Sequence, residues 1–438
     1  MTSLTVILLA VVILAILLIV GIPVPFAFSG VTIVLVFILG YDPAFLIPAS
    51  FAKLNSLVLV CIPLFIIAGT IIREGKIGDA LIGFVEQFVG RLRTGLGMVT
   101  VVVCAIFGAI SGSSSATLSA VGSIMAPKLA ERGYPRGIIA ALLASSSVLG
   151  LLIPPSAAQI LYAWSSNTSV LACFLATIVP GIIAACLFCV VQHFQVRNLE
   201  SVKESQIEPM DMHIGPVMSR TAKAIPALMM PVIILGGIYG GFMTTMEAAA
   251  VAAVYCVPIA LWVYKGLKPR QLWSCLVEAG YNCGAIAMML MSCMILSRVF
   301  TTENVPNALV QMTQSITTNP IMIMVMINIV MVILGMLMDD GSAIVLSTPL
   351  LLPIALSIGV DPVHYAAIMG VNLGMGLVTP PCAPMLFLGA QVARSPVHEA
   401  FKPTMQYILF AWLPTLILTI AIPRLSLFLP GLILGYGG

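Results

Sequence analysis

The amino-acid sequence contains the same long pattern twice, and this duplication constrains the fold more than any other feature. Shifting the chain by 226 positions places Pro127 on Pro353 and Pro154-Pro155 on Pro380-Pro381 without a gap. Such regular spacing indicates an internal repeat of the kind found in secondary transporters. The two halves are therefore expected to form the same elements in the same order.

Each copy places small polar residues inside apolar sequence. The first copy carries serines and a glycine at Ser111–Ser115, and the second carries aspartates, a glycine and a serine at Asp339–Ser342. A double proline follows in each copy and is expected to break its helix, because proline removes a backbone donor and clashes with the preceding turn. Polar tips and broken helices at membrane depth are typical of ion and substrate sites in transporters.

The composition is that of a membrane protein. Of the 438 residues, 60% are hydrophobic and 8% are charged, whereas a soluble domain carries roughly 25% charged residues. Many apolar runs approach the ~20 residues that a membrane-spanning helix needs. We expect an all-α polytopic protein embedded in the lipid bilayer. The net charge is small and the sequence has no basic cluster, so a nucleic-acid partner is not expected.

The apolar N-terminal segment is predicted to be a retained helix. Leu4–Val20 has no charged region before it and runs into the next apolar segment after Gly21-Ile22-Pro23, which is unlike a cleaved signal peptide. The ten cysteines lie almost entirely within apolar runs. We interpret them as small packing residues.

Charges on both flanks predict that the serine-containing segment, residues 96–127, does not cross the membrane. Arg91 and Arg93 precede it, and Lys128 and Arg132 follow it. Positive charge marks the cytoplasmic side of a membrane protein, so both ends are expected there. The segment is therefore predicted to be a re-entrant helical hairpin whose tip lies at Ser111–Ser115.

The same arrangement is predicted in both halves. The first repeat covers 1–196, with its hairpin at 96–127 and a proline-broken helix at 137–163; a polar cytoplasmic connector covers 197–223; the second repeat covers 224–438, with its hairpin at 320–358 and a broken helix at 363–392. An odd number of crossings in the first half inverts the second, which gives inverted-topology repeats. With the N-terminus outside, 16 of the 19 Lys and Arg residues lie in inside loops, as the positive-inside rule requires.

The first tip carries a predicted cation site and a predicted anion site. Its incoming helix ends in free carbonyl groups, which suit Na⁺, and its outgoing helix begins with free N–H groups, which suit a carboxylate. The predicted Na⁺ ligands are Ser113, Ser115 and a carbonyl freed near Gly150. The N–H groups of Ser114 to Ala116 and the Ser114 hydroxyl are predicted to hold an organic anion. The alternative is that these serines only pack between helices.

The second tip adds carboxylates to the predicted site. Acids at membrane depth usually face a cavity or a cation, and Asp340, Ser342 and the break at Thr379 are predicted to form a second Na⁺ site. Two cations would balance the aspartate and part of an anionic substrate. The alternative is that the tip reaches the interface and its acids are hydrated. Of the two aspartates, Asp339 is the better candidate for a hydrated residue.

Two further polar residues near the breaks are assigned to substrate binding. Ser156 directly follows the first double proline, and Asn372 lies about two helical turns (~7 residues) before the second. The predicted substrate contacts are thus Ser113, Ser114, Ser115, Ala116, Ser156 and Asn372.

The paired motifs resemble the large permease subunit of tripartite ATP-independent periplasmic (TRAP) transporters. The resemblance covers nearly the whole chain and is carried most specifically by Gly108–Ser156 and Gly335–Pro384. Thr244-Thr245-Met246-Glu247-Ala248 also matches, except that Met246 stands where the family pattern has proline.

The resemblance implies a Na⁺-driven secondary importer of the elevator type in a bacterial inner membrane, with a periplasmic N-terminus. It also implies two partners, a small four-helix membrane subunit and a periplasmic substrate-binding protein. The cargo would be a small organic anion such as a dicarboxylate, a keto acid or a sugar acid. No ATP is used, in agreement with the absence of a Walker A motif from the sequence.

Two alternative functions agree less well with the sequence. Gly108-Ala109-Ile110-Ser111-Gly112 superficially resembles an intramembrane serine-protease motif, but the spacing is wrong and no histidine lies in a helix core to act as a base. An enzyme is therefore not expected. The closer alternative is a stand-alone Na⁺- or H⁺-coupled anion symporter or antiporter that works without a binding protein.

Overall fold

The computed structural model describes residues 3–75, 77–89, 95–199, 202 and 214–436, and the regular elements in these ranges are helices. The first half contains α1 (Ser3–Ile19), α2 (Val24–Leu39), α3 (Pro43–Leu54), α4 (Cys61–Glu74), α5 (Ile77–Val89), α6 (Gly95–Ser111), α7 (Ser114–Glu131), α8 (Arg136–Ser147), α9 (Ala157–Ser166) and α10 (Val170–Val196). The second half contains α12 (Ile214–Tyr239), α13 (Thr245–Pro258), α14 (Pro269–Thr302), α15 (Val305–Ile316), α16 (Pro320–Leu337), α17 (Asp340–Ser357), α18 (Pro362–Val378), α19 (Pro384–Ala393), α20 (Val397–Tyr407), α21 (Leu413–Ala421) and α22 (Arg424–Leu434).

The helices are apolar enough to cross a membrane. Seven helical stretches within the described residues meet the length and composition expected of a span, and several shorter apolar helices accompany them. Large apolar side chains such as Phe37 and Trp262 are exposed on the outside of the bundle. In water such exposure would be costly, but in a bilayer these side chains face lipid.

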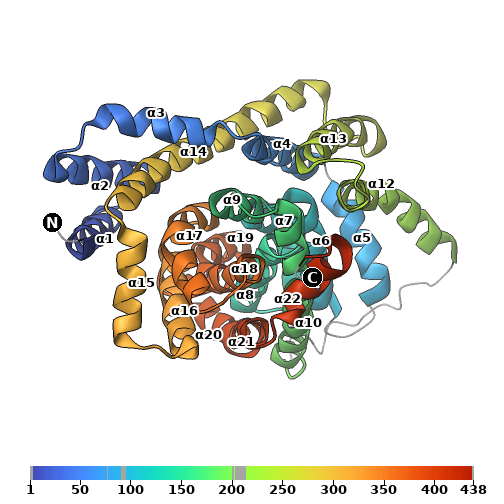
Figure 1. Cartoon of the computed structure of the whole chain (residues 1–438). Helices are drawn as coiled ribbons and strands as arrows, with labels where there is room; N and C mark the ends of the chain where they lie inside the picture. The colour runs from blue at the N-terminus through green and yellow to red at the C-terminus, as the bar shows by residue number, and fades with distance from the viewer. Residues whose placement is uncertain (1–2, 76, 90–94, 200–201, 203–213, 437–438) are drawn as a thin grey trace.

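The helices form an outer layer and a core bundle (Figure 1). The outer layer consists of α1–α4 and α12–α14, and the long helix α14 runs along it and packs on α2, α3 and α4. The core bundle consists of α6–α10 and α16–α22. Helices α5 and α15 lie between the two groups in the chain: α5 packs on α6 and α12, and α15 packs on α14 and α17. Each half therefore reaches the core through one short connecting helix.

Both predicted hairpins are present and match in register. Helices α6 and α7 form the first, and α16 and α17 form the second. The outgoing arms begin at Ser114 and Asp340, and the incoming arms end at Ser111 and Leu337. Both pairs are 226 residues apart, as the sequence repeat predicts.

Both predicted helix breaks are also present. In the first, α8 continues as a short 3₁₀ turn, η2 (Val148–Leu151), and α9 begins after the prolines. In the second, α18 ends before Thr379 and α19 begins at Pro384. The peptide bond between the two prolines is cis in both breaks. The expected all-α class, with a re-entrant hairpin and a proline-broken helix in each half, is thus confirmed.

Glycine pairs bring each hairpin against the broken helix of its own half. A Cβ atom added to Gly108 on α6 would lie 2.6 Å from the Cα of Gly150 in η2. In the second half, a Cβ added to Gly376 on α18 would lie 2.9 Å from the Cα of Gly335 on α16. Only residues without a side chain permit backbones to approach so closely. The breaks are therefore held beside the incoming arms of the hairpins.

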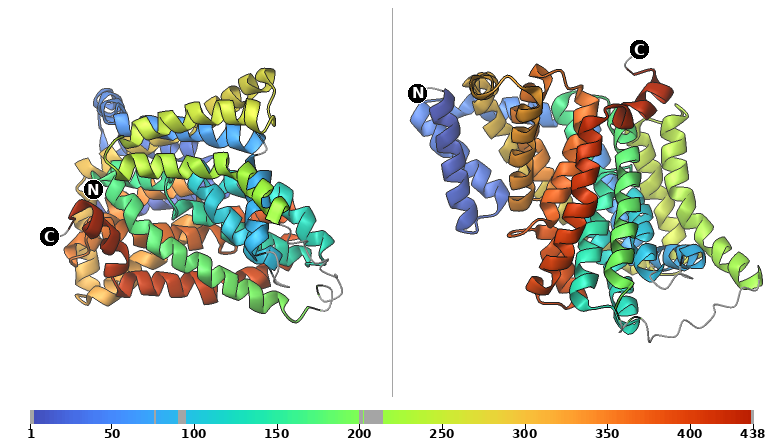
Figure 2. Two further views of the ribbon diagram at one scale, coloured as in Figure 1. Left: turned by 90° about the vertical axis from the view of Figure 1, so that its right-hand side faces the viewer. Right: turned by 90° about the horizontal axis from the view of Figure 1, so that it is seen from below.

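The two halves are interleaved in the core bundle. The outgoing arm α17 packs on α9, which is the second part of the other half's broken helix, and α7 packs on α19 in the same way. The two repeats therefore share one core instead of forming two separate bodies (Figure 2).

The boundary between the repeats stays a prediction. Helix α10 ends at Val196 and α12 begins at Ile214, which agrees with a connector in this part of the chain. Most of the predicted connector, residues 200–201 and 203–213, lies outside the described residues, as do Arg91 and Arg93.

Candidate functional site

The first hairpin turns at Gly112, whose φ is +63°. This left-handed conformation favours glycine because a side chain would be strained there. Ser113 follows as the N-cap of α7, and its hydroxyl accepts a hydrogen bond from the Ala116 N–H at 3.5 Å. Of the four first-turn N–H groups of α7, which have no partner within the helix, one is thus weakly capped. The rest of this turn resembles the anion-binding helix starts of other proteins.

This tip is docked onto the first helix break. The Ala157 N–H at the start of α9 donates to the Gly112 carbonyl at 3.2 Å. A Cβ added to Gly112 would lie 3.1 Å from the Pro155 carbonyl oxygen. Ser156 is fully buried between them, and its hydroxyl has no hydrogen-bond partner among the described residues. The predicted contact residue Ser156 thus lies beside the tip with a free polar atom.

Oxygen atoms converge where the tip meets η2. Thr117 donates its hydroxyl to the Ser113 carbonyl at 2.8 Å and lies 2.9 Å from the Ser111 hydroxyl oxygen. A Cβ on Gly150 would lie 3.5 Å from the Thr117 Oγ1 and 3.6 Å from the carbonyl carbon of Ser113. The structure therefore brings the predicted ligands Ser113 and Gly150 together. It adds Thr117 and Ser111, which are not among the predicted ligands.

Ser115 lies at the edge of this cluster. Its side chain is exposed, and its hydroxyl oxygen lies 3.2 Å from that of Ser113. Its position permits a contact with the same ion or substrate as Ser113, although it faces outward in this conformation.

The two aspartates of the second tip have different roles. Asp339 is exposed and caps α17, because its carboxylate accepts hydrogen bonds from the N–H and the hydroxyl of Ser342. Asp340 is half-buried, and its carboxylate accepts the Gly341 N–H at 2.9 Å. Because Asp339 caps α17, its carboxylate has a structural role in stabilising the helix. Asp340 is therefore the aspartate available for an ion.

The two tips meet at residues that the repeat makes equivalent. The side chains of Ser114 and Asp340 lie near each other, and the fully buried Ser114 hydroxyl has no hydrogen bond within the described part of the chain. Residues 226 positions apart can touch each other only close to the axis that relates the two repeats. The first residues of α7 and α17 thus lie close together.

The remaining predicted residues have other partners in this conformation. The hydroxyl oxygen of Ser342, which donates to Asp339, also lies 2.7 Å from the Met289 sulfur on α14, and the hydroxyl of Thr379 donates to the Met375 carbonyl at 2.6 Å. Asn372 is buried and donates its amide to the side chain of Asn328 on α16 at 2.5 Å. The structure thus does not show Ser342 bonded to Thr379, and Asn372 joins α18 to the hairpin arm.

The two breaks differ in accessibility. Pro154, Pro155 and Ser156 of the first break are buried, whereas Pro381 and Cys382 of the second are exposed. Because sequence-equivalent segments have different surroundings, the two halves occupy different positions relative to the outer layer.

Both hairpins rest on the outer layer through small or flexible residues. A Cβ on Gly69 of α4 would lie 3.5 Å from the Cβ of Ser111, and a Cβ on Gly341 would lie 3.3 Å from the Met289 methyl carbon on α14. Neither contact contains an ion pair. Such a surface resists sliding less than interlocked large side chains would.

The donors at the tips are hydroxyl, carbonyl and carboxylate oxygens. Among the described residues, no group of three His, Cys, Asp or Glu side chains is placed to hold a metal ion. Oxygen donors with a single carboxylate suit a weakly bound hard cation better than a transition metal. Together with two helix N-termini, these groups could bind a small anion and a cation side by side.

Comparison of the sequence with known proteins identifies one family. Residues 11–425 match the family model described as "Tripartite ATP-independent periplasmic transporter, DctM component". The chain is 35% identical to the C4-dicarboxylate TRAP transporter large permease protein DctM of Pseudomonas aeruginosa, over 85% of this chain and 86% of that protein. It is 28% identical to the sialic acid TRAP transporter large permease protein SiaM of Vibrio cholerae, over 88% of each chain.

Two other relatives extend the comparison. The isethionate TRAP transporter permease protein DctMQ of Oleidesulfovibrio alaskensis is 34% identical over 95% of this chain, which spans 65% of that protein's length. Among solved structures, the YdaH transporter of Alcanivorax borkumensis superposes with a TM-score of 0.58 over 88% of each chain, at 14% identity. At that identity the likeness concerns the fold alone.

Proposed function

Because this chain belongs to the DctM family of large permease components of tripartite ATP-independent periplasmic transporters, we propose that it imports a small organic anion by Na⁺ coupling. Its relatives are transporter permeases, and the chain is a multi-pass membrane transport protein of the inner membrane, not an enzyme. The substrate, the coupling ion and the partners are the subject of the proposal.

The observation that carries the proposal is the meeting of the two hairpin tips. At that point Ser114 at the start of α7 interacts with Asp340 at the start of α17. Helix N-termini attract anions, so the N–H groups of Ser114 to Ala116 would hold a substrate carboxylate. A buried carboxylate beside an anionic substrate is unfavourable unless cations offset both charges. Anion binding here therefore requires accompanying cations.

Two Na⁺ positions would satisfy this requirement. The first would use Ser113, Ser115 and a carbonyl near Gly150, supported by the convergence of Ser113 and Gly150, and Thr117 adds a further oxygen. The second would use Asp340, Ser342 and Thr379. The Ser342 hydroxyl, which is bonded to Asp339 and lies beside the Met289 sulfur, would have to turn its oxygen toward the ion, so we propose that this site is completed when the second hairpin moves.

Transport would occur by movement of the core bundle against the outer layer. The small and flexible residues at both tips, and the connecting helices α5 and α15, support such an elevator motion. Substrate contacts would be completed by Ser156, whose buried hydroxyl lacks a partner in the described structure. Asn372 would act indirectly, because its hydrogen bond to Asn328 holds α18 against α16.

The family description implies a three-part system. We propose that a small four-helix membrane subunit and a periplasmic substrate-binding protein are the other two parts, and that no ATP is consumed. The N-terminus would be periplasmic, since this orientation puts 16 of 19 Lys and Arg residues on the cytoplasmic side. Relatives named for C4-dicarboxylates, sialic acid and isethionate support a small organic acid as the cargo.

The test is uptake by proteoliposomes with and without the periplasmic protein. Thermal-shift screening of organic acids against that protein would first identify the ligand, which is then supplied in radiolabelled form. We expect uptake only when the loaded binding protein is present. Uptake at the same rate from free ligand would instead identify a stand-alone symporter or antiporter.

A further inference from the structure

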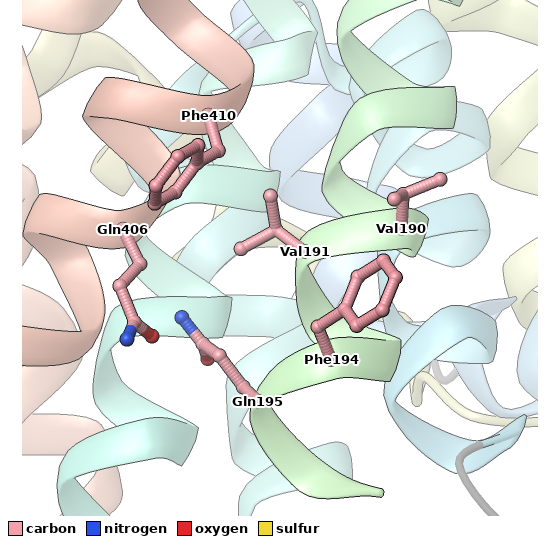
Figure 3. A pocket seen from close by; sticks show the side chains of 6 residues that line it. All are labelled: Val190, Val191, Phe194, Gln195, Gln406 and Phe410. Carbon is pink, nitrogen blue, oxygen red and sulfur yellow. The ribbon is translucent and has the colours of Figure 1, made fainter.

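A groove lies on the surface of the core bundle (Figure 3). Its residues are distant in the sequence from both hairpin tips. It has a volume of about 430 Å³ and runs between α10 and the segment formed by α20 and the π-helical turn η4 (Ile408–Trp412). Its lining residues are Val190, Val191, Phe194, Gln195, Gln406 and Phe410.

The groove is apolar at one end and polar at the other. Phe410 and the two valines form the apolar end, and Gln195 and Gln406 lie at the opposite end (Figure 3). The rims are open to the surroundings, because Phe194 and Phe410 are 57% and 63% exposed. In a membrane protein such an opening faces lipid, and its wall is suited to an acyl chain.

The polar end contains an unused hydrogen-bond acceptor. The Gln195 amide donates to the Pro403 carbonyl at 3.0 Å, which fixes its orientation. Its other atom, the Oε1 oxygen, is buried and has no partner among the described residues. A buried amide oxygen without a donor is unfavourable. A ligand hydroxyl or a water molecule at this end of the groove would satisfy it.

Basic residues continue the groove beyond the glutamines. Arg197 follows Gln195, and its guanidinium carbon lies 4.8 Å from the centre of the Phe194 ring. Lys402 precedes Gln406 by one helical turn and is exposed. The acid on α20, Glu399, accepts a hydrogen bond from the Ser395 hydroxyl at 3.3 Å and keeps its negative charge, so two basic residues stand against one acid. Positive charge thus stands at the polar end, which is cytoplasmic in the orientation proposed above.

We propose that this groove binds one anionic phospholipid of the phosphatidylglycerol type. An acyl chain would lie along Val190, Val191 and Phe410, and the phosphate would pair with Arg197 and Lys402. The glycerol hydroxyls of the headgroup would reach the Gln195 oxygen. Basic pockets between membrane helices on the cytoplasmic side are known to select anionic headgroups. The lipid would join α10 to the continuous helical segment Val397–Ala421, which contains α20.

Native mass spectrometry of the purified full chain tests this proposal without any transport assay. The protein in detergent is titrated with phosphatidylglycerol or with phosphatidylcholine. We expect one phosphatidylglycerol to bind in preference. The double variant Arg197→Gln/Lys402→Gln should bind it roughly tenfold or more weakly, because each basic residue near an anionic headgroup contributes about fivefold. Lys265→Gln/Arg270→Gln, the same charge change at exposed residues elsewhere, should bind it normally.

A second variant separates the groove from general surface charge. Val190→Trp adds a large ring at the half-exposed rim and should also reduce phosphatidylglycerol binding while keeping both basic residues. The proposal is overturned if both groove variants bind the lipid like the unaltered chain, or if the control pair loses it equally. It is also overturned if a photoreactive residue in place of Phe194 crosslinks in native membranes to a protein instead of to lipid.

Discussion

At the scale of single residues, neighbouring side chains of the same type have different roles. Asp339 caps α17 while Asp340 faces Ser114, although the two are adjacent. Ser113 caps α7 while Ser115 faces outward. Mutation of neighbours is therefore more informative than mutation of either residue alone.

Asp340→Asn should keep the protein folded but abolish Na⁺-coupled uptake. The substitution preserves the shape and removes the charge that a cation would balance. Asp339→Asn is the matched control, because asparagine is as good an N-cap as aspartate, and it should retain most of the activity. Both are measured as initial uptake rates in proteoliposomes at several Na⁺ concentrations. Normal Na⁺ dependence in Asp340→Asn would make this residue a hydrated tip residue.

Thr117→Val should raise the Na⁺ concentration needed for half-maximal uptake on the order of tenfold, because it removes one oxygen from the first proposed site at constant shape. Ser123→Ala, on the same helix, removes a hydroxyl that bonds only to the Ala120 carbonyl in the structure, and should leave the Na⁺ dependence unchanged. An equal response of the two variants would exclude a ligand role for Thr117.

At the scale of helices, the contact between α6 and the first break depends on the lack of a side chain. Gly108→Ala would place a Cβ 2.6 Å from the Gly150 Cα, which belongs to backbone and cannot rotate aside as the end of a flexible side chain could. We expect destabilisation of about 1–3 kcal/mol. It should appear as a lower melting temperature of the detergent-solubilised protein.

Gly280→Ala is the matched control for that prediction. Gly280 lies within α14, and a Cβ there would meet no atom within 4 Å. Alanine is the better helix former by up to about 1 kcal/mol, so the melting temperature should stay the same or rise. Two variants that melt alike would contradict the glycine contact.

Much of this architecture could be predicted from the sequence, since the repeat offset gave both hairpin turns and both breaks. Helix α3 does not follow from the repeat or from the long apolar runs, because it is short and begins at Asp42-Pro43, which can also end the preceding helix. In the structure Asp42 caps α3 by accepting the Ala44 N–H, with Pro43 in the first turn. An aspartate followed by proline is also a helix start signal.

The contacts of the site were harder to predict than its location. The sequence indicated that Ser342 and Asn372 are near the tip and the break. Their partners Met289 and Asn328 lie 53 and 44 residues away in the chain. Such pairs depend on how whole helices pack, which no local pattern encodes. The surroundings of the run Ser111–Thr117 likewise depend on η2, a segment of the broken helix that packs on both arms of the hairpin.

At the scale of the whole molecule, the proposed motion can be trapped. In a background without the native cysteines, Gly69→Cys and Ser111→Cys would join the outer layer to the first hairpin. Their Cβ atoms would lie 3.5 Å apart, which is compatible with a disulfide. Oxidation should abolish uptake, and reduction should restore it, if the core bundle moves against α4.

The two single-cysteine variants, Gly69→Cys alone and Ser111→Cys alone in the same background, serve as the control for that experiment. Each lacks a disulfide partner, so the same oxidation should leave its uptake intact. Full uptake with the Gly69–Ser111 bond formed would exclude sliding at this contact.

Sodium coupling is the central claim, and its direct measurement is uptake driven by an imposed ion gradient. Proteoliposomes containing this chain and its small subunit are loaded with K⁺ and supplied with the radiolabelled ligand on its binding protein. With Na⁺ only outside, we predict accumulation above the equilibrium level, and its loss when Na⁺ is equal on both sides or replaced by K⁺. Accumulation that persists without a Na⁺ gradient, or that follows a proton gradient instead, would contradict the account.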